Sequence, residues 1–437
     1  MLYYINDTDI ESVCDSVRSK FSYCYKLSFP EEVMGLVHRR TIPTDYIAYN
    51  LIAKGYTFSG QLTSEQTVSI SKIMSSRFMR YRLTHAEFPD CTEIGESAFY
   101  DCSNLSHISF PECTTISSCA FCRCSYLQEA VFPKCTTLGR SAFNFCWDLS
   151  QASFPRLSVV ADYAFAYCSH LKNIDILHCS AIGNYAFDRC SSLESICAPS
   201  CSFVGSCAFS LCSKLGYVDL PACTYVADSA FYSCPYLWFM DLTNCIEIGY
   251  RAFYNCQIRQ ISLPECLSIG NSVFHYCRYL NSVFAPKCTS LGNFCFCYCT
   301  DLSNVSLPKA TAIYSNGFAL CTGLTSIVLP ECSLVGYSAF QECSSLSIVS
   351  LPSCSIISSC AFKSCISLKS LYLTGSYLVS LSGSGWFDNT PIETSSYLGE
   401  FGSIYVPAAL YSIYGMALNW TKYKDRFVSV EGGDSNE

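Results

Sequence analysis

The sequence predicts a repeat solenoid, strand-rich and of the α/β type, built from about 13 coils of 22 residues. A 22-residue pattern recurs from Pro89 onward, and the same residue types return at fixed places in each copy. The composition agrees, because 33 of the 437 residues are Cys and only 14% are charged, fewer than in ordinary globular domains. Coils that cover one another leave few positions in water, which accounts for the low charge.

The repeat is defined by columns of apolar residues. Thirteen units begin between Pro89 and Pro352; twelve have 22 residues, and the unit from Thr243 has 21. The tenth residue after each start is Phe and the thirteenth is Cys in all thirteen units. The second is Cys in eleven, the exceptions being Leu157 and Ala310, and the fifth is always Ile, Leu or Val. One coil cannot bury such a face alone, so stacked coils are expected to share a core with an aromatic spine.

A recognisable sequence motif spans the junction between successive units. From Leu105 to Ile116 the chain reads L-x-x-I-x-F-P-x-C-x-x-I, which fits the leucine-rich repeat rule L-x-x-L-x-L-x-x-N/C. The wider wording Ile-Gly-x-x-Ala-Phe-x-x-Cys-x-x-Leu-x-x-Ile-x-Phe-Pro resembles the BspA-type, or treponemal, bacterial leucine-rich repeat. The resemblance covers residues 83–373 and implies a non-catalytic recognition or adhesion protein.

Residues 1–82 precede the period and are expected to form a mainly helical N-terminal cap. The capping pattern Thr8-Asp9-Ile10-Glu11 opens an apolar stripe with helical spacing. Leu83, Ala86 and Phe88 then occupy the column positions of a partial first coil. A cap of this kind is needed because an open end of a solenoid exposes its core.

Residues 374–430 are expected to form a mixed C-terminal capping region, followed by a disordered tail at 431–437. The stretch Ser380 to Gly385 is rich in Ser and Gly and predicts a flexible loop. Pro407 suits the first position of a helix, and Trp420 is expected to plug the last coil.

Both ends also resemble segments of prophage proteins. The stretch from Ile10 to Met34 is similar to a short segment of structural proteins in prophages of Gram-positive gut bacteria. Residues 374–430 resemble the strand-plus-helix cap that follows such repeats in bacterial and prophage proteins. These resemblances imply a tail-associated virion protein that contacts a host surface. A BspA-like cell-surface adhesin is the alternative.

The cysteines suggest either metal and redox chemistry or a packed thiol ladder. Zinc sites use close C-x₂-C pairs, whereas the spacing here is set by the repeat, so the ladder is favoured and no metal or cofactor is expected. Disulfides between coils are a minor alternative, since stacked Cα atoms about 5 Å apart permit them. Cys122 and Cys297 lie at a turn position, either as exposed reactive thiols or, as favoured, as tolerated surface substitutions. The thirteenth-position ladder consists of Cys102, Cys124, Cys146, Cys168, Cys190, Cys212, Cys234, Cys256, Cys277, Cys299, Cys321, Cys343 and Cys365.

Several functions are disfavoured. A net charge of −8 argues against nucleic-acid binding, and no run of 18 apolar residues predicts membrane insertion. The N-terminus lacks the basic and apolar regions of a signal peptide, so synthesis in the cytoplasm is expected, with a virion or the cell surface as the place of action. The six His are scattered, and no nucleophile elbow or phosphate-binding loop occurs, so an enzyme is not expected.

A cluster of aromatic residues is the candidate binding site. The solvent-facing positions of the longer strands are mostly small and polar, as at Ser106, His107 and Ser109. Within four successive coils this pattern is interrupted by large rings, and rigid exposed aromatics favour recognition of a protein or glycan, for example a cell-surface component. The alternative is that the rings only pack on one another or on a neighbouring molecule. The candidate residues are Tyr217, Trp238, Phe239 and Phe284.

Overall fold

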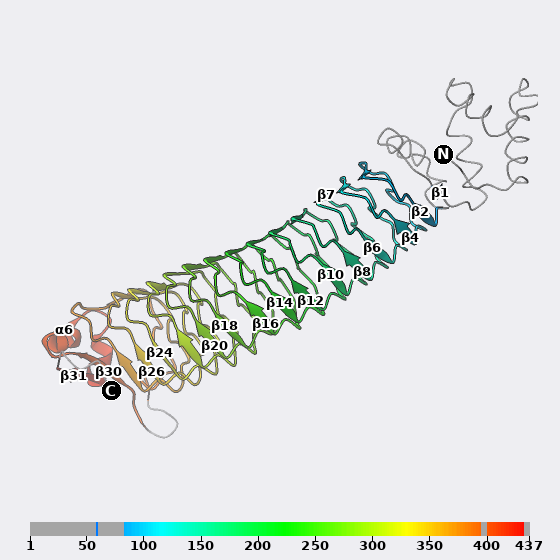
Figure 1. Ribbon diagram of the computed structural model, residues 1–437. Helices are drawn as coiled ribbons and strands as arrows, with labels where there is room; N and C mark the ends of the chain where they lie inside the picture. Colours follow the sequence, from blue (N-terminus) through cyan, green and yellow to red (C-terminus); the bar gives the residue numbers. More distant parts are fainter. Residues whose placement is uncertain (1–57, 60–82, 395–399, 432–437) are drawn as a thin grey trace, which may run out of the picture. The chain divides into compact units, whose positions relative to one another are not determined.

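The computed structural model describes residues 58–59, 83–394 and 400–431 (Figure 1). The predicted helices of residues 1–82 and the tail beyond residue 431 lie outside these ranges. The chain divides into two compact units, Met1–Cys179 with Ala186–Leu193, and Ser180–Tyr185 with Glu194–Glu437. In each unit the coils stack through parallel strands of two kinds, longer and shorter, and strands of each kind pair among themselves, so the predicted solenoid is confirmed.

In the first unit every strand pair is parallel. Apart from the pair that joins Phe58 to Ala86, the partners lie one repeat apart, as in Ile94 beside Ile116. This register holds each apolar column over itself, which is what a 22-residue period requires. The longer strands are β2 (His85–Glu87), β4 (His107–Ser109), β6 (Glu129–Val131), β8 (Gln151–Ser153) and β10 (Asn173–Asp175), and the two-residue β1 (Phe58–Ser59) pairs with β2. The shorter strands are β3 (Glu93–Ile94), β5 (Thr115–Ile116), β7 (Thr137–Leu138) and β9 (Val159–Val160).

The second unit repeats the arrangement. Glu247 pairs with Ser268 across the 21-residue unit, so the missing residue leaves the shorter strands in register. The longer strands are β12 (Ser195–Cys197), β14 (Tyr217–Asp219), β16 (Phe239–Asp241), β18 (Gln260–Ser262), β20 (Ser282–Phe284), β22 (Asn304–Ser306), β24 (Ser326–Val328), β26 (Ile348–Ser350), β28 (Ser370–Tyr372), β30 (Ser403–Pro407) and β31 (Phe427–Val430). The shorter strands are β11 (Ala181–Ile182), β13 (Phe203–Val204), β15 (Tyr225–Val226), β17 (Glu247–Ile248), β19 (Ser268–Ile269), β21 (Ser290–Leu291), β23 (Ala312–Ile313), β25 (Leu334–Val335), β27 (Ile356–Ile357) and β29 (Ser380–Leu381).

The Phe column forms the predicted aromatic spine. In the second unit, neighbouring rings from Phe209 to Phe362 have centroids 5.0–5.6 Å apart and lie within 19° of parallel. The coil spacing of about 4.8 Å explains the stacking, because identical side chains at that spacing meet face to face. The Phe, Cys and Leu columns are buried throughout. Leu83, Ala86 and Phe88, which occupy column positions of the partial first coil, are buried too.

The turn that carries each Phe contains two residues in the left-handed region, although neither column holds a glycine. In the unit from Pro221 these are Ser229 and Ser233, with φ of 56° and 52°. The amides of Ser229, Phe231 and Ser233 all donate to carbonyl oxygens of the next coil, at 2.7–2.8 Å. The strained turn is thus stabilised by a third ladder of inter-coil hydrogen bonds.

The segment after Leu373 differs from its prediction. Ser380–Leu381, expected in a flexible loop, form β29, which pairs in parallel with β27. The ring of Phe387 stacks on Phe362 at 5.6 Å and continues the spine. Glycines 383 and 385 have φ of 83° and 71°, so they take up a conformation that favours glycine rather than forming a linker. The stack therefore contains a further coil of irregular length.

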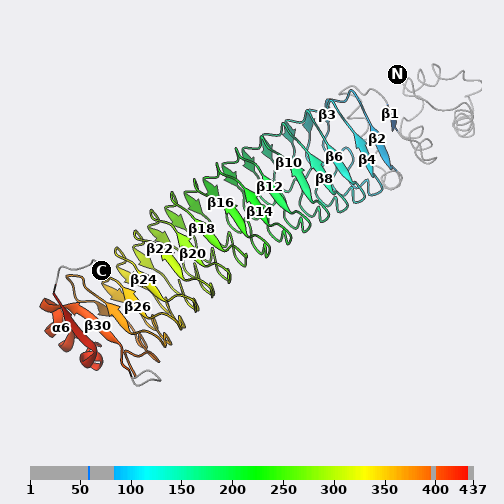
Figure 2. The same cartoon turned by 60° about the horizontal axis from the view of Figure 1, so that its bottom comes forward.

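The end of the second unit is closed by short helices. After β30 come η1 (Ala408–Leu410), α6 (Tyr411–Met416) and η2 (Thr421–Arg426), and Figure 2 shows α6 beyond the last parallel strands. Pro407 was predicted at the first position of a helix. It instead ends β30 and is the N-cap of η1, one residue before the first helical position. Trp420 is buried as predicted, and its Nε1 donates to the carbonyl of Val379 at 2.7 Å.

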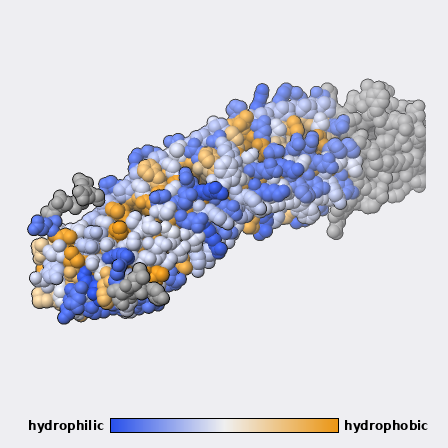
Figure 3. All heavy atoms as spheres, turned by 90° about the horizontal axis from the view of Figure 1, so that it is seen from below, coloured by the Kyte–Doolittle hydropathy of each residue, from blue (hydrophilic) through white to orange (hydrophobic). Residues whose placement is uncertain are grey.

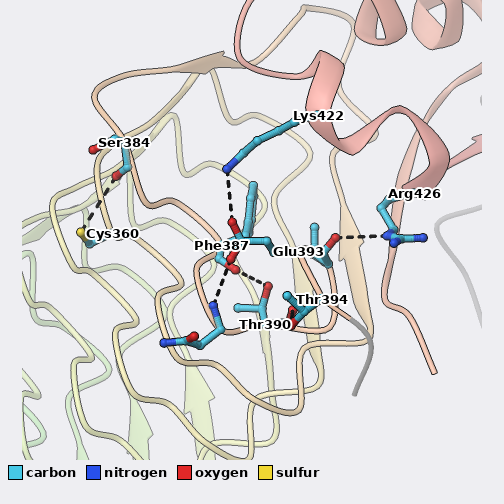
Figure 4. Close-up of polar contacts among 10 residues, drawn as sticks. Cys360, Ser384, Phe387, Thr390, Glu393, Thr394, Lys422 and Arg426 are labelled. Atoms are coloured by element: carbon cyan, nitrogen blue, oxygen red, sulfur yellow. Dashed lines mark hydrogen bonds and ion pairs between the residues drawn. The ribbon is translucent and has the colours of Figure 1, made fainter. Parts of the chain in front are cut away.

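Polar contacts tie η2 to the irregular coil (Figure 4). Lys422 Nζ lies 3.4 Å from Glu393 Oε1, and Arg426 Nε donates to the carbonyl oxygen of Ile392 at 3.2 Å. Within the coil, the hydroxyl of Thr390 donates to the carbonyl of Phe387 at 2.6 Å. These bonds hold the cap against the last ring of the spine.

Candidate functional site

The cysteine ladder packs as predicted and donates to carbonyl groups. Cys234 Sγ donates to the carbonyl of Phe209 in the preceding coil at 3.1 Å, and ten further members make the same bond at 3.0–3.2 Å. Second-position cysteines such as Cys113 donate within their own coil. Burial raises the pKa of ladder thiols such as Cys124 well above its ordinary value. The thiols are therefore held neutral, which makes them poor nucleophiles and poor metal ligands.

The prediction that Cys122 and Cys297 lie at the surface is wrong. Their side chains are 7% and 4% exposed, and burial raises the pKa of each thiol to about 12. Coils on either side lie about 4.8 Å away, so a short side chain at this position is covered by its neighbours. The exposed cysteine of the described residues is Cys197, at an outward position of β12, with Sγ 3.7 Å from Asp219 Oδ2. Sequence reasoning did not single it out.

Within the described residues, no three His, Cys, Asp or Glu side chains are grouped as ligands for a metal ion. The same part of the chain contains no helix with the length and apolar character needed to cross a membrane. In the view of Figure 3, hydrophobic residues form small groups among hydrophilic ones.

Three of the four predicted ring-bearing residues come together on the longer strands of the second unit. We call Tyr217, Trp238 and Phe239 the aromatic patch; their side chains are 39%, 58% and 39% exposed. Tyr217 of β14 and Phe239 of β16 are paired in register, and their rings stack at 5.0 Å and 8°. Trp238 lies 6.2 Å and 5.9 Å from the two rings and is tilted against both. The strand pairing holds the patch in place.

Gly216 makes room for the tryptophan. A Cβ atom at Gly216 would lie 3.1 Å from Nε1 and 3.4 Å from Cδ1 of Trp238, so the indole sits over the glycine. The backbone bond from Trp238 N to the carbonyl of Gly216, at 3.2 Å, places the two residues in one column of adjacent coils. A side chain at Gly216 would displace the indole by a few tenths of an ångström or more.

Phe284 is exposed on the same sheet surface but lies apart from the patch. It is the third residue of β20 and pairs with Ser262, whereas Tyr217 and Phe239 are the first residues of their strands. Two residues along a strand span about 6.6 Å, and β18 lies between. No ring contact joins Phe284 to another ring in the described part of the chain. The four residues share a surface, and three of them share a site.

Carboxylates follow the patch along the same strands. Asp219 and Asp241 are the paired third residues of β14 and β16. Asp241 Oδ1 accepts from the amide and the hydroxyl of Thr243 at 3.0 Å and 2.9 Å, which holds the carboxylate in one orientation. The patch thus joins apolar rings to fixed hydrogen-bond acceptors.

A second group of rings, which sequence reasoning missed, lies on the turns that carry the Phe column. Tyr232 stacks on Tyr254 at 5.0 Å, and His275 stacks on Tyr276 at 4.4 Å. Burial, assisted by the charge of Arg251, lowers the pKa of His275 to about 4, and its Nε2 has no hydrogen-bond partner in the described part of the chain. The sequence feature that could have predicted this group is the recurrence of Tyr and His at the eleventh and twelfth positions of successive units.

The parallel two-sheet coil, its period and its columns decide the family. A model of the BspA-type leucine-rich repeat region, in six copies, matches residues 55–172, 158–281 and 289–409. The chain belongs to this family. Proteins with BspA-type repeats are generally non-catalytic and bind protein or other ligands, which suggests protein binding or adhesion for this member.

One solved structure agrees on the fold, and two others are similar in sequence over most of the chain. A leucine-rich repeat protein from Bacteroides ovatus is 22% identical, with a TM-score of 0.55 over 80% of this chain and 84% of that one. A leucine-rich cell surface protein from Faecalibacterium prausnitzii is 20% identical over 70% and 79%, with a TM-score of 0.34. The pneumococcal vaccine antigen PcpA is 15% identical over 82% and 80%, with a TM-score of 0.33. A search of curated proteins finds no match for this BspA-type chain.

Proposed function

We propose that this chain is a non-catalytic recognition protein that binds a protein or glycan through the aromatic patch. The observation that carries the proposal is the contact among Tyr217, Trp238 and Phe239, three exposed rings on a rigid sheet. Aromatic side chains dominate binding hot spots, and a preordered surface loses little conformational entropy on binding. The rings do pack on one another, but each leaves more than a third of its side chain exposed.

Two biological settings are proposed, each supported by a different observation. The resemblance of both chain ends to prophage proteins supports a tail-associated virion protein that contacts a host surface. Membership of the BspA-type family supports the alternative, a cell-surface adhesin. Mass spectrometry of purified virions and of the cell-surface fraction of the source bacterium distinguishes them, because the chain is enriched in one fraction only.

The proposal is tested by binding of the full purified chain to bacterial cells and to glycan and protein arrays. Trp238→Ala and Phe239→Ala are each expected to weaken binding about 30-fold, the effect of a hot-spot loss of about 2 kcal/mol. Trp147→Ala removes another exposed tryptophan, in the first unit, and serves as the control. Equal losses in all three variants, or no loss in any, would sink the proposal.

Gly216→Ala provides a test that leaves the ring in place. The new methyl group meets the indole of Trp238, so binding is expected to weaken while the fold is retained. Gly95→Ala is the matched control, because no atom outside its chain neighbours lies within 4 Å of an added Cβ there. Unchanged binding by Gly216→Ala would mean that the orientation of Trp238 is irrelevant.

A further inference from the structure

The shortened coil lies directly beside the aromatic patch. In full-length coils a leucine amide donates to the carbonyl of the ladder cysteine three residues earlier, as from Leu237 to Cys234 and from Leu280 to Cys277, both at 3.1 Å. In the unit from Thr243 only Gln257 separates Cys256 from Ile258, so this described segment has no such turn. One coil without a turn thus stands between two coils that have one.

Each flanking turn carries an exposed tyrosine at the same position. Tyr236 and Tyr279 are 63% and 52% exposed, and no aromatic contact joins either ring to another described residue. Their columns are two coils apart, or about 10 Å. A six-membered ring midway between them would lie about 5 Å from each, within the 4.5–7 Å range of ring contacts. The shortened coil places one residue, Gln257, between the two turns where a full-length coil places two.

The surroundings are cationic, although the chain carries a net charge of −8. Arg259 leaves the shortened coil in the column of Trp238, as the bond from Asn281 N to the Arg259 carbonyl at 2.8 Å shows. Its exposed guanidinium makes no ion pair or cation–π contact with a described residue. Arg278 lies on the turn of Tyr279, and Lys214 occupies the position of Tyr236 one coil earlier. Asp301 occupies the position of Tyr279 one coil later. An anionic ligand would therefore find an unpaired cation beside two rings.

We infer that this rim binds an acidic glycan, with a uronate sugar ring between Tyr236 and Tyr279 and its carboxylate paired with Arg259. A pyranose ring presents apolar C–H faces to aromatic rings, and its hydroxyl edge suits the amides of Gln257 and Asn281. Arg is well matched to carboxylate because its fork of N–H donors binds both oxygens. The inference rests on the proposed function and names the ligand class for the same surface.

A nucleic acid fits this rim less well. Single-stranded chains also combine stacking with positive charge, but they need a cationic groove that follows several phosphates. Here three cations are followed along the strands by the carboxylates of Asp219 and Asp241. A single acidic sugar matches the one unpaired guanidinium better than a phosphate backbone does.

The test titrates the full chain with tri-galacturonate, with neutral maltotriose of the same length, and with an oligothymidylate, by isothermal calorimetry. Tri-galacturonate is expected to bind at least tenfold more tightly than maltotriose. Arg259→Gln should remove this preference, and Tyr279→Ala should weaken both sugars. Tyr126→Ala changes the same turn position between full-length coils, where the ring is 56% exposed, and should change neither. Absence of tri-galacturonate binding, or preference for the oligothymidylate, would overturn the inference.

An insertion gives an independent arm. One serine placed between Gln257 and Ile258 restores 22 residues, a length that twelve other units carry, so the fold should be retained by circular dichroism. The restored turn fills the space between the tyrosines and should abolish tri-galacturonate binding. Wild-type affinity in this variant contradicts the inference. If cell binding depends on Phe239 while tri-galacturonate does not bind, the proposed function stands and the ligand class is wrong. If tri-galacturonate binds but cell binding does not depend on Phe239, the proposed function is rejected.

Discussion

The aromatic spine predicts a specific pattern of coupling between coils. Phe231 is fully buried between Phe209 and Phe253, at centroid distances of 5.1 Å and 5.3 Å. Phe→Leu keeps an apolar side chain but removes the ring contacts, each of which contributes about 0.5–1.5 kcal/mol beyond burial. Phe231→Leu and Phe253→Leu lose two contacts each, whereas the double variant loses three. The sum of the single effects should therefore exceed the double effect by one contact, about 0.5–1.5 kcal/mol.

The measurement is urea unfolding followed by far-ultraviolet circular dichroism for the wild type, both single variants and the double variant. The control pair is Phe231 and Phe340, five coils apart in the same column, which shares no ring. Their effects should add to within about 0.3–0.5 kcal/mol. An adjacent pair that is additive, or a distant pair coupled as strongly as the adjacent one, would refute nearest-neighbour stacking as the source of the coupling.

Three further outcomes are expected. Ser229 has φ of 56°, so Ser229→Val should lower the free energy of unfolding by about 1–2 kcal/mol, whereas Ser229→Gly should leave it nearly unchanged; equal costs would contradict the strain argument. A thiol reagent should label exposed Cys197 in the native protein and buried Cys124 only after unfolding, as peptide mapping can check; early labelling of Cys124 would contradict its burial. Because the pKa of His275 is about 4 in the folded chain and 6.5 in its ordinary state, the unfolded chain binds more protons between these values. The melting temperature should therefore fall as pH drops from 6.5 to 4, and less so in His275→Phe; parallel curves would contradict this.

The sequence predicted the columns well because a repeated pattern averages out local ambiguity. A Phe that recurs at one position in thirteen units has to occupy one structural place, and the stacked rings confirm it. The left-handed turns were not predicted, since glycine, the usual signal, is absent from both columns. A weaker signal was present: Val, Ile and Thr, which tolerate positive φ least, do not occur there.

The candidate site was predicted only in part. Large rings at solvent-facing positions identified Tyr217, Trp238 and Phe239. Phe284 was grouped with them because it lies within four successive coils, although the repeat already places it two positions further along its unit than Phe239. Burial of Cys122 was missed because it comes from the coils on either side rather than from its own unit. The sequence of a single unit does not show the contacts that its residues make with neighbouring coils.

Because each column holds similar residues in every coil, one coil can be removed or added without disturbing the stacking of the others. If residues 286–307 were removed, Phe274 would meet Phe318 in place of Phe296, and every column would close again. The aromatic patch would then lie about 4.8 Å closer to the C-terminal cap, with none of its own residues altered. Duplication of a coil would have the opposite effect. The distance between the aromatic patch and the C-terminal cap is thus set by the number of repeats between them.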